Sequence, residues 1–235
     1  DEKLDAYKGT PDQQPQVLHV IGSGDVSERL LSEAEAITTR LKLQPRWTPV
    51  QLESELDRAL ALDPTNVAAL TMKAERDRAD AAKLAERAVN AHPDDPGAWA
   101  LRARWPGKAG REALKEGEVD LRKAHELAPD DAEIALDLAS HLLGMGKAQQ
   151  ALPFVVQAER AQPWKPVMFY IGALVRAAAG LCDEADGDSV RYARLMTNDG
   201  AERPREPEEL LAKRLRACRS RGGEAAIHHR RTGDP

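Results

Sequence analysis

The chain has 235 residues, of which 42% are hydrophobic and 31% are charged, and its formal net charge is −5. A chain of this length buries a core without needing disulfides or metals, and the negative charge argues against nucleic acid as a partner. Aromatic residues make up only 4%, which disfavours a β-sandwich or barrel, whereas the abundant Ala, Leu and Glu favour helix. No apolar run approaches the roughly 18 residues of a membrane-spanning helix.

Residues 1–24 are predicted to form an N-terminal arm or linker. Residues 1–16 are polar and contain several Gln and Pro. Residues 17–21 (VLHVI) are apolar enough for a strand, but no partner strand is evident. We therefore expect this segment to pack in an extended form on the first helix.

The first helix is predicted over residues 26–43. Asp25 and Glu28 have the spacing of a capping box, in which two side chains satisfy the first N–H groups of a helix. Apolar residues follow at helical spacing, at Leu30, Leu31, Ala34, Ile37 and Leu41. The run Thr48-Pro49-Val50-Gln51 carries the signals of a second helix start, because it combines a capping Thr with a Pro at the first helical position.

From residue 51 onward, four segments end in the same way, with an Ala five residues before a Pro. The segments are LDRALALDP, AERAVNAHP, LRKAHELAP and VVQAERAQP, and they end at Pro64, Pro93, Pro129 and Pro163. Successive prolines are 29, 36 and 34 residues apart. A recurring spacing of this size indicates a stacked array of helical repeats.

The segment 132–163 is the best copy, and it resembles a tetratricopeptide repeat (TPR). Small residues and a turn glycine stand where that motif places them, at Leu138-Ala139, Gly146, Ala151, Val155, Ala158 and Pro163. Weaker copies make the resemblance cover residues 26–195 with about four to five repeats, some of them degenerate. It implies an all-α fold, an α-α superhelix over 25–195, although related helical-array families remain the alternative.

A loop and a capping helix are predicted over residues 196–221. Apolar residues lie on one side of this helix, at Leu210, Leu211, Leu215 and Cys218, as the end of a helical array requires. Gly222-Gly223 is predicted to end the helix, and residues 222–235 are expected to be a disordered tail.

No constellation of residues in the sequence indicates catalysis. Gly22-Ser23-Gly24-Asp25 lacks the spacing and the Lys of a phosphate-binding loop, and no Ser has the sequence of a nucleophile elbow. The acidic pairs Asp94-Asp95 and Asp130-Asp131 follow the repeat-closing prolines, where Asp caps the next helix, so we interpret them as caps and not as calcium ligands. We therefore expect no enzyme activity, no cofactor and no metal.

The resemblance implies a partner-binding groove on the concave face, lined by the first helix of each repeat. Carried over repeat by repeat, its positions are Thr71, Glu75, Arg78, Arg104, Asp137, Ser140, His141, Tyr170 and Leu174. Some members of the family hold a chaperone's C-terminal carboxylate with Lys and Asn. In this chain those slots are occupied by Thr71, Ala100, Leu136 and Tyr170, so the carboxylate clamp is not present.

The expected function is therefore a non-catalytic scaffold or adaptor that binds a protein or peptide in this groove, or one that sits as a subunit of a larger assembly. The alternative is an accessory module of a longer polypeptide whose catalytic part lies elsewhere. Cys182 and Cys218 either form one disulfide between the last helices or remain two reduced core thiols. The cysteine pair and the absence of an initial Met favour an exported bacterial protein over a cytoplasmic one.

Overall fold

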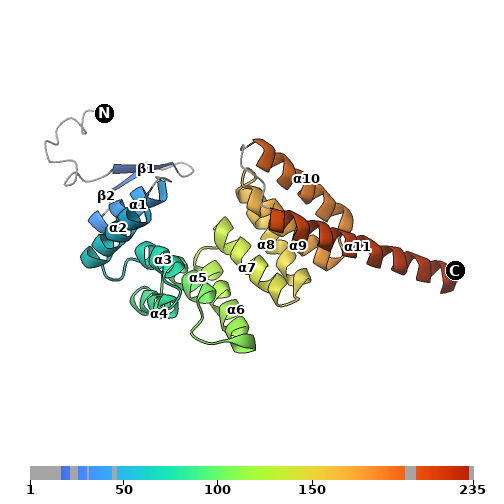
Figure 1. The fold of residues 1–235 in the computed structure, drawn as a ribbon, viewed down its shortest axis with the longest axis horizontal. Helices are drawn as coiled ribbons and strands as arrows, with labels where there is room; N and C mark the ends of the chain where they lie inside the picture. The colour runs from blue at the N-terminus through green and yellow to red at the C-terminus, as the bar shows by residue number, and fades with distance from the viewer. Residues whose placement is uncertain (1–16, 22–25, 31, 44–46, 199–204, 233–235) are drawn as a thin grey trace. The chain divides into compact units, whose positions relative to one another are not determined.

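The computed structural model describes residues 17–21, 26–30, 32–43, 47–198 and 205–232. The chain divides into two compact units, Asp1–Pro93 and Asp94–Pro235. Apart from one β-hairpin, the described elements are helices that pack in consecutive pairs (Figure 1). The predicted all-α helical array is thus confirmed.

Unit 1 opens with a β-hairpin, in which β1 (Val17–Ile21) pairs antiparallel with β2 (Val26–Leu30). The register sets Val17 opposite Leu30 and Ile21 opposite Val26. The prediction that residues 26–30 begin the first helix was therefore wrong, because this segment is the partner strand that the sequence did not reveal. Pairing satisfies the backbone groups of β1 that face β2, and a helix starting at residue 26 would leave these groups without a partner strand.

Helix α1 (Glu33–Leu43) has a different capping box from the one predicted. The N–H of Ser32 donates to Glu35 Oε2 over 2.8 Å, and the N–H of Glu35 donates to Ser32 Oγ over 3.2 Å. Glu28 lies in β2, and Asp25 lies outside the described residues. Three of the predicted apolar positions are correct, since Ala34, Ile37 and Leu41 are buried.

Unit 1 continues with α2 (Pro49–Leu62), α3 (Val67–Arg76) and α4 (Ala81–Ala91). The predicted start of α2 is confirmed, because Thr48 and Gln51 form a capping box. Helices α1 and α2 pack together around Ile37, Leu41 and Leu56.

Unit 2 holds three further pairs and a last helix. The pairs are α5 (Pro96–Arg104) with α6 (Gly110–Leu127), α7 (Ala132–Gly144) with α8 (Ala148–Ala161), and α9 (Pro166–Ala179) with α10 (Cys182–Asn198). Helix α5 ends at Arg104, directly before Trp105-Pro106-Gly107. As predicted, Gly146 lies in the turn between α7 and α8, where it takes a positive φ of 75°.

The four repeat-closing segments end their helices by one mechanism. The residue before each Pro leaves the helical conformation, with φ of −136°, −132°, −136° and −135° at Asp63, His92, Ala128 and Gln162. Its N–H still donates to the carbonyl of the repeated Ala, at Ala59, Ala88, Ala124 and Ala158. Because a Pro disfavours helical geometry in the residue before it, the sequence alone determines where these helices stop.

The last helix, α11 (Arg205–Thr232), packs against α9 and α10 as the predicted cap. The predicted end at Gly222 was wrong, since the helix continues to Thr232. Residues 233–235 of the predicted tail lie outside the described part. Glycine costs only about 1 kcal/mol relative to Ala inside a helix, whereas Pro costs about 3. The pair Gly222-Gly223 therefore weakens the helix without ending it.

Candidate partner-binding face

Arg104 on α5 and Asp137 on α7 form an ion pair between the first helices of two neighbouring repeats. Arg104 Nη2 donates to Asp137 Oδ2 over 3.0 Å, and the two side chains are 44% and 37% exposed. Partial burial raises the pKa of Asp137, and the positive charge of Arg104 opposes this shift. The pair joins two predicted groove residues and leaves both of them accessible to a partner.

Ser140 and His141 follow on α7. Ser140 is half-buried. His141 Nε2 donates to the carbonyl of Leu114 on α6 over 2.7 Å. The imidazole ring therefore links α7 to α6, which belongs to the preceding helix pair. Its hydrogen bond gives His141 a structural role, whether or not its ring also contacts a partner.

The two predicted groove residues on α9 differ in their exposure. Tyr170 is half-buried, and its ring centre lies 5.4 Å from that of Tyr192 on α10. Burial raises the pKa of the Tyr170 hydroxyl, as does the neighbouring Tyr192. Leu174 is only 7% exposed, because it belongs to a cluster with Leu211 and Leu215 of α11. Leu174 is therefore a core residue, and α11 covers the position that the resemblance assigned to the groove.

The remaining predicted residues lie in unit 1. The hydroxyl of Thr71 donates to the carbonyl of Val67 within α3, over 2.8 Å. Glu75 is exposed in the last turn of the same helix, whereas Arg78 lies in the turn beyond it, since α3 ends at Arg76. These three residues therefore do not form one row along a helix.

A buried ion triad in unit 2 was not predicted from the sequence. Arg176 on α9 lies between Glu159 of α8 and Asp188 of α10, and donates from Nη1 and Nη2 to Glu159 over 2.5 and 2.8 Å. Burial and the charge of Glu159 raise the pKa of Asp188 to about 6, against the influence of Arg176. Nothing in the sequence signals the triad, because its members come from three helices.

Gly172 makes room for this triad on α9. A Cβ at this position would overlap Glu159 Oε1 and would lie 2.7 Å from Arg176 Nη1. The three charged side chains are only 6–12% exposed, so they stabilise the packing of three helices and do not present a binding surface.

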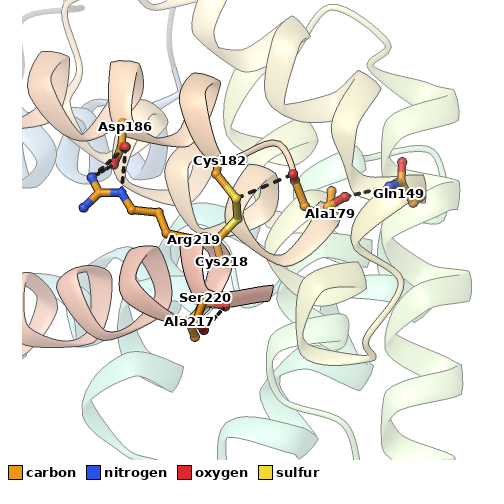
Figure 2. Close-up of a disulfide and its surroundings, with 9 residues drawn as sticks. Gln149, Ala179, Cys182, Asp186, Ala217, Cys218, Arg219 and Ser220 are labelled. Carbon is orange, nitrogen blue, oxygen red and sulfur yellow. Dashed lines mark hydrogen bonds and ion pairs between the residues drawn. A yellow bond between two sulfur atoms is a disulfide. The ribbon is translucent and has the colours of Figure 1, made fainter. Parts of the chain in front are cut away.

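The acidic residues and cysteines considered above have structural roles. Asp95 and Asp131 cap α5 and α7 by accepting backbone N–H groups. Across the described ranges, no group of His, Cys, Asp and Glu is arranged to hold a metal, and every helix is too short or too polar to cross a membrane. Cys182 and Cys218, for which two states were expected as alternatives, are joined in a disulfide (Figure 2).

The sequence matches no protein-family model and no curated protein. Among solved structures, the chain is similar to TTC0263, a thermophilic TPR protein of Thermus thermophilus, with a TM-score of 0.54 and 18% identity over 77% of this chain and 97% of that one. It also resembles the MamA protein, with a TM-score of 0.49 and 16% identity over 73% of this chain and 96% of that one. The paired helices and the likeness to TTC0263 together show that the chain has the TPR fold, a solenoid of helical repeats.

Proposed function

We propose that the chain is a non-catalytic scaffold that binds a protein or peptide partner on the face formed by the first helices of the repeats in unit 2. The observation that carries this proposal is the accessible Arg104–Asp137 ion pair between α5 and α7. The apolar sides of the same helices are buried in the core, at residues such as Leu101 and Leu138, so this face is not needed for packing.

The chemistry of the face suits a peptide with polar backbone and side-chain groups. A guanidinium presents several donors in a fixed plane, and a carboxylate accepts backbone N–H groups. Ser140 lies one helical turn beyond Asp137, on the same side of α7. A partner whose polar groups replace the Arg104–Asp137 contact would accept from the guanidinium and donate to the carboxylate. Binding of this kind exposes no apolar surface.

We also propose that the protein works in an oxidising compartment, as an exported protein. The support is the Cys182–Cys218 disulfide, since such bonds persist outside the reducing cytosol. Trapping free thiols in freshly lysed cells tests this point. Recovery of both cysteines as free thiols in the native material would contradict it.

The binding proposal is tested by identifying the partner and then measuring its affinity calorimetrically. The wild-type chain serves first as bait, and the partner recovered is purified and titrated against Arg104→Glu/Tyr170→Ala. We expect an affinity loss of about tenfold or more, the size typical of central contacts in an interface.

The matched control is Arg122→Glu on α6. Arg122 is similarly exposed, at 46%, and is also paired with an acid, Glu118, so the charge reversal is chemically the same on a second helix of a repeat. Circular dichroism confirms that each variant is folded. Unchanged affinity in the Arg104→Glu/Tyr170→Ala variant, or an equal loss in the control, would show that the face is wrongly assigned.

A further inference from the structure

Helix α11 covers an apolar surface at the end of the repeat array. Phe169, Ala173, Leu174 and Ala177 of α9, together with Ala185 and Tyr192 of α10, form this surface. We call it the end surface. The cap meets it with three side chains, Leu211, Leu215 and Cys218, which are 4%, 9% and 1% exposed.

Besides its three buried side chains, α11 is joined to α10 by an exposed, two-pronged ion pair. In this pair Arg219 Nε and Nη2 donate to Asp186 over 3.1 and 2.7 Å. Arg219 is 61% exposed, so water and salt screen this pair. The neighbouring Leu210 is 42% exposed and adds little burial.

The disulfide joins α10 to α11 within this contact. Cys182 is the first residue of α10 and is half-buried. Cys218 lies on the side of α11 that faces the end surface and is almost fully buried. Figure 2 shows the sulfur–sulfur bond bridging the two helices beside the Arg219–Asp186 pair. The link closes a loop with a sequence separation of 36 residues. A reductant therefore reaches the Cys182 sulfur more easily than the Cys218 sulfur.

We propose that Cys182–Cys218 is a thiol–disulfide switch that determines whether α11 stays on the end surface. The co-reactant is a dithiol, acting as reductant. One of its thiolates attacks Cys182 Sγ and forms a mixed disulfide, while the electron pair of the broken bond goes to Cys218 Sγ, which takes up a proton. The second thiolate of the reductant then attacks its own mixed disulfide and releases Cys182, which is also protonated. The reductant leaves as a disulfide, and the protein gains two thiols.

In the oxidised state the link keeps α11 in place even when its side-chain contacts break. A disulfide that closes a loop of this length restricts the detached ensemble by roughly several hundredfold. Reduction therefore raises the frequency with which α11 leaves the end surface by about that factor. The segment that occupies and vacates this surface is α11 itself.

Hydrogen exchange of the full chain, read by mass spectrometry, tests the switch. Peptides covering residues 207–220 are compared before and after treatment with dithiothreitol, with residues 132–161 of α7 and α8 as the internal reference. We expect α11 amides to exchange roughly several hundredfold faster in the reduced protein, while the reference peptides keep their rates. Equal exchange of α11 in both states would overturn the proposal, and so would faster exchange throughout unit 2, which would make the bond purely structural.

A chemical readout uses the burial of Cys218. In Cys182→Ser this thiol is free but shielded by the contact between α11 and the end surface. Its alkylation rate therefore reports how often α11 leaves that surface. Adding Arg219→Gln should raise the rate severalfold, because it removes the pair with Asp186. The matched change Arg216→Gln, on the same helix at an exposed position, should leave it unaltered. Equal rates in the two double variants would contradict the switch.

Discussion

At the scale of single residues, two glycines in the last repeat differ in the space around them. Gly172 on α9 faces the ion triad, and a Cβ there would overlap Glu159 and Arg176. Gly187 on α10 has no atom within 4 Å of the position that a Cβ would take. The first glycine is needed for space, whereas the second only lowers the helix propensity of α10.

Gly172→Ala should therefore lower the free energy of unfolding by about 1–3 kcal/mol, since the triad must shift to admit the methyl group. Gly187→Ala is the control and should raise it by up to about 1 kcal/mol. Urea unfolding followed by circular dichroism measures both variants. If the two substitutions change stability in the same direction, the packing described around Gly172 is incorrect.

Asp188 makes the stability of unit 2 dependent on pH. Its pKa is about 6 in the folded chain, against an ordinary value of 3.8. Between these two values the folded chain holds a proton that the unfolded chain releases, so the contribution of Asp188 to stability is present below pH 3.8 and is lost as the pH rises through about 6.

Asp188→Asn removes this dependence, because an amide does not titrate. The difference in unfolding free energy between the wild type and Asp188→Asn should fall by about 2–3 kcal/mol from about pH 4 to about pH 7. Parallel urea titrations at these two pH values measure it. A difference that stays constant, or that grows with pH, would contradict a protonated Asp188 in the triad.

At the scale of elements, two adjacent leucines of α11 differ in their contacts with the array. Leu211 is 4% exposed within the cluster on α9 and α10, whereas the adjacent Leu210 is 42% exposed. With the disulfide intact, Leu211→Ala should lower the free energy of unfolding by about 2–4 kcal/mol through the cavity it leaves. Leu210→Ala should change it by less than about 1 kcal/mol. Thermal denaturation distinguishes them, and equal effects would mean that α11 presents a different side to the array.

Helix ends could be predicted where the signal is local. The residues before Pro64, Pro93, Pro129 and Pro163 leave the helix because the proline ring acts on its immediate neighbour, and no distant contact is involved. The start of α1 could not be predicted in the same way, since the conformation of residues 26–30 depends on pairing with residues 17–21. The end of α11 was missed because two glycines weaken a helix without breaking it.

The candidate face was harder to predict than the fold. Arg104 and Asp137 were identified from the resemblance, and the structure brings them together. Leu174 was misplaced because a repeat motif describes a helix in the middle of an array, whereas α9 is followed by α11. Glu159, Arg176 and Asp188 were missed since their meeting depends on how three helices pack.

At the scale of the whole molecule, unit 2 should fold by itself. Three core clusters, centred on Phe169, Leu138 and Met168, lie entirely within residues 94–235, as do the ion triad and the disulfide. In helical arrays, stability comes mainly from contacts between neighbouring repeats. A fragment of residues 94–235 should therefore show a helical circular dichroism spectrum and a cooperative thermal transition. A fragment that is unfolded at room temperature would show that unit 2 depends on unit 1.

The Cys182–Cys218 bond also determines how the molecule responds to tension. When a chain is pulled by its two ends, a covalent cross-link carries the load past the residues between its ends. Each residue of a stretched chain adds at most about 3.6 Å, so a separation of 36 residues hides roughly 120–130 Å of contour length. All of α10 beyond its first residue, and the first half of α11, lie in this unloaded loop. A stretched oxidised molecule should stop extending that much earlier than a reduced one.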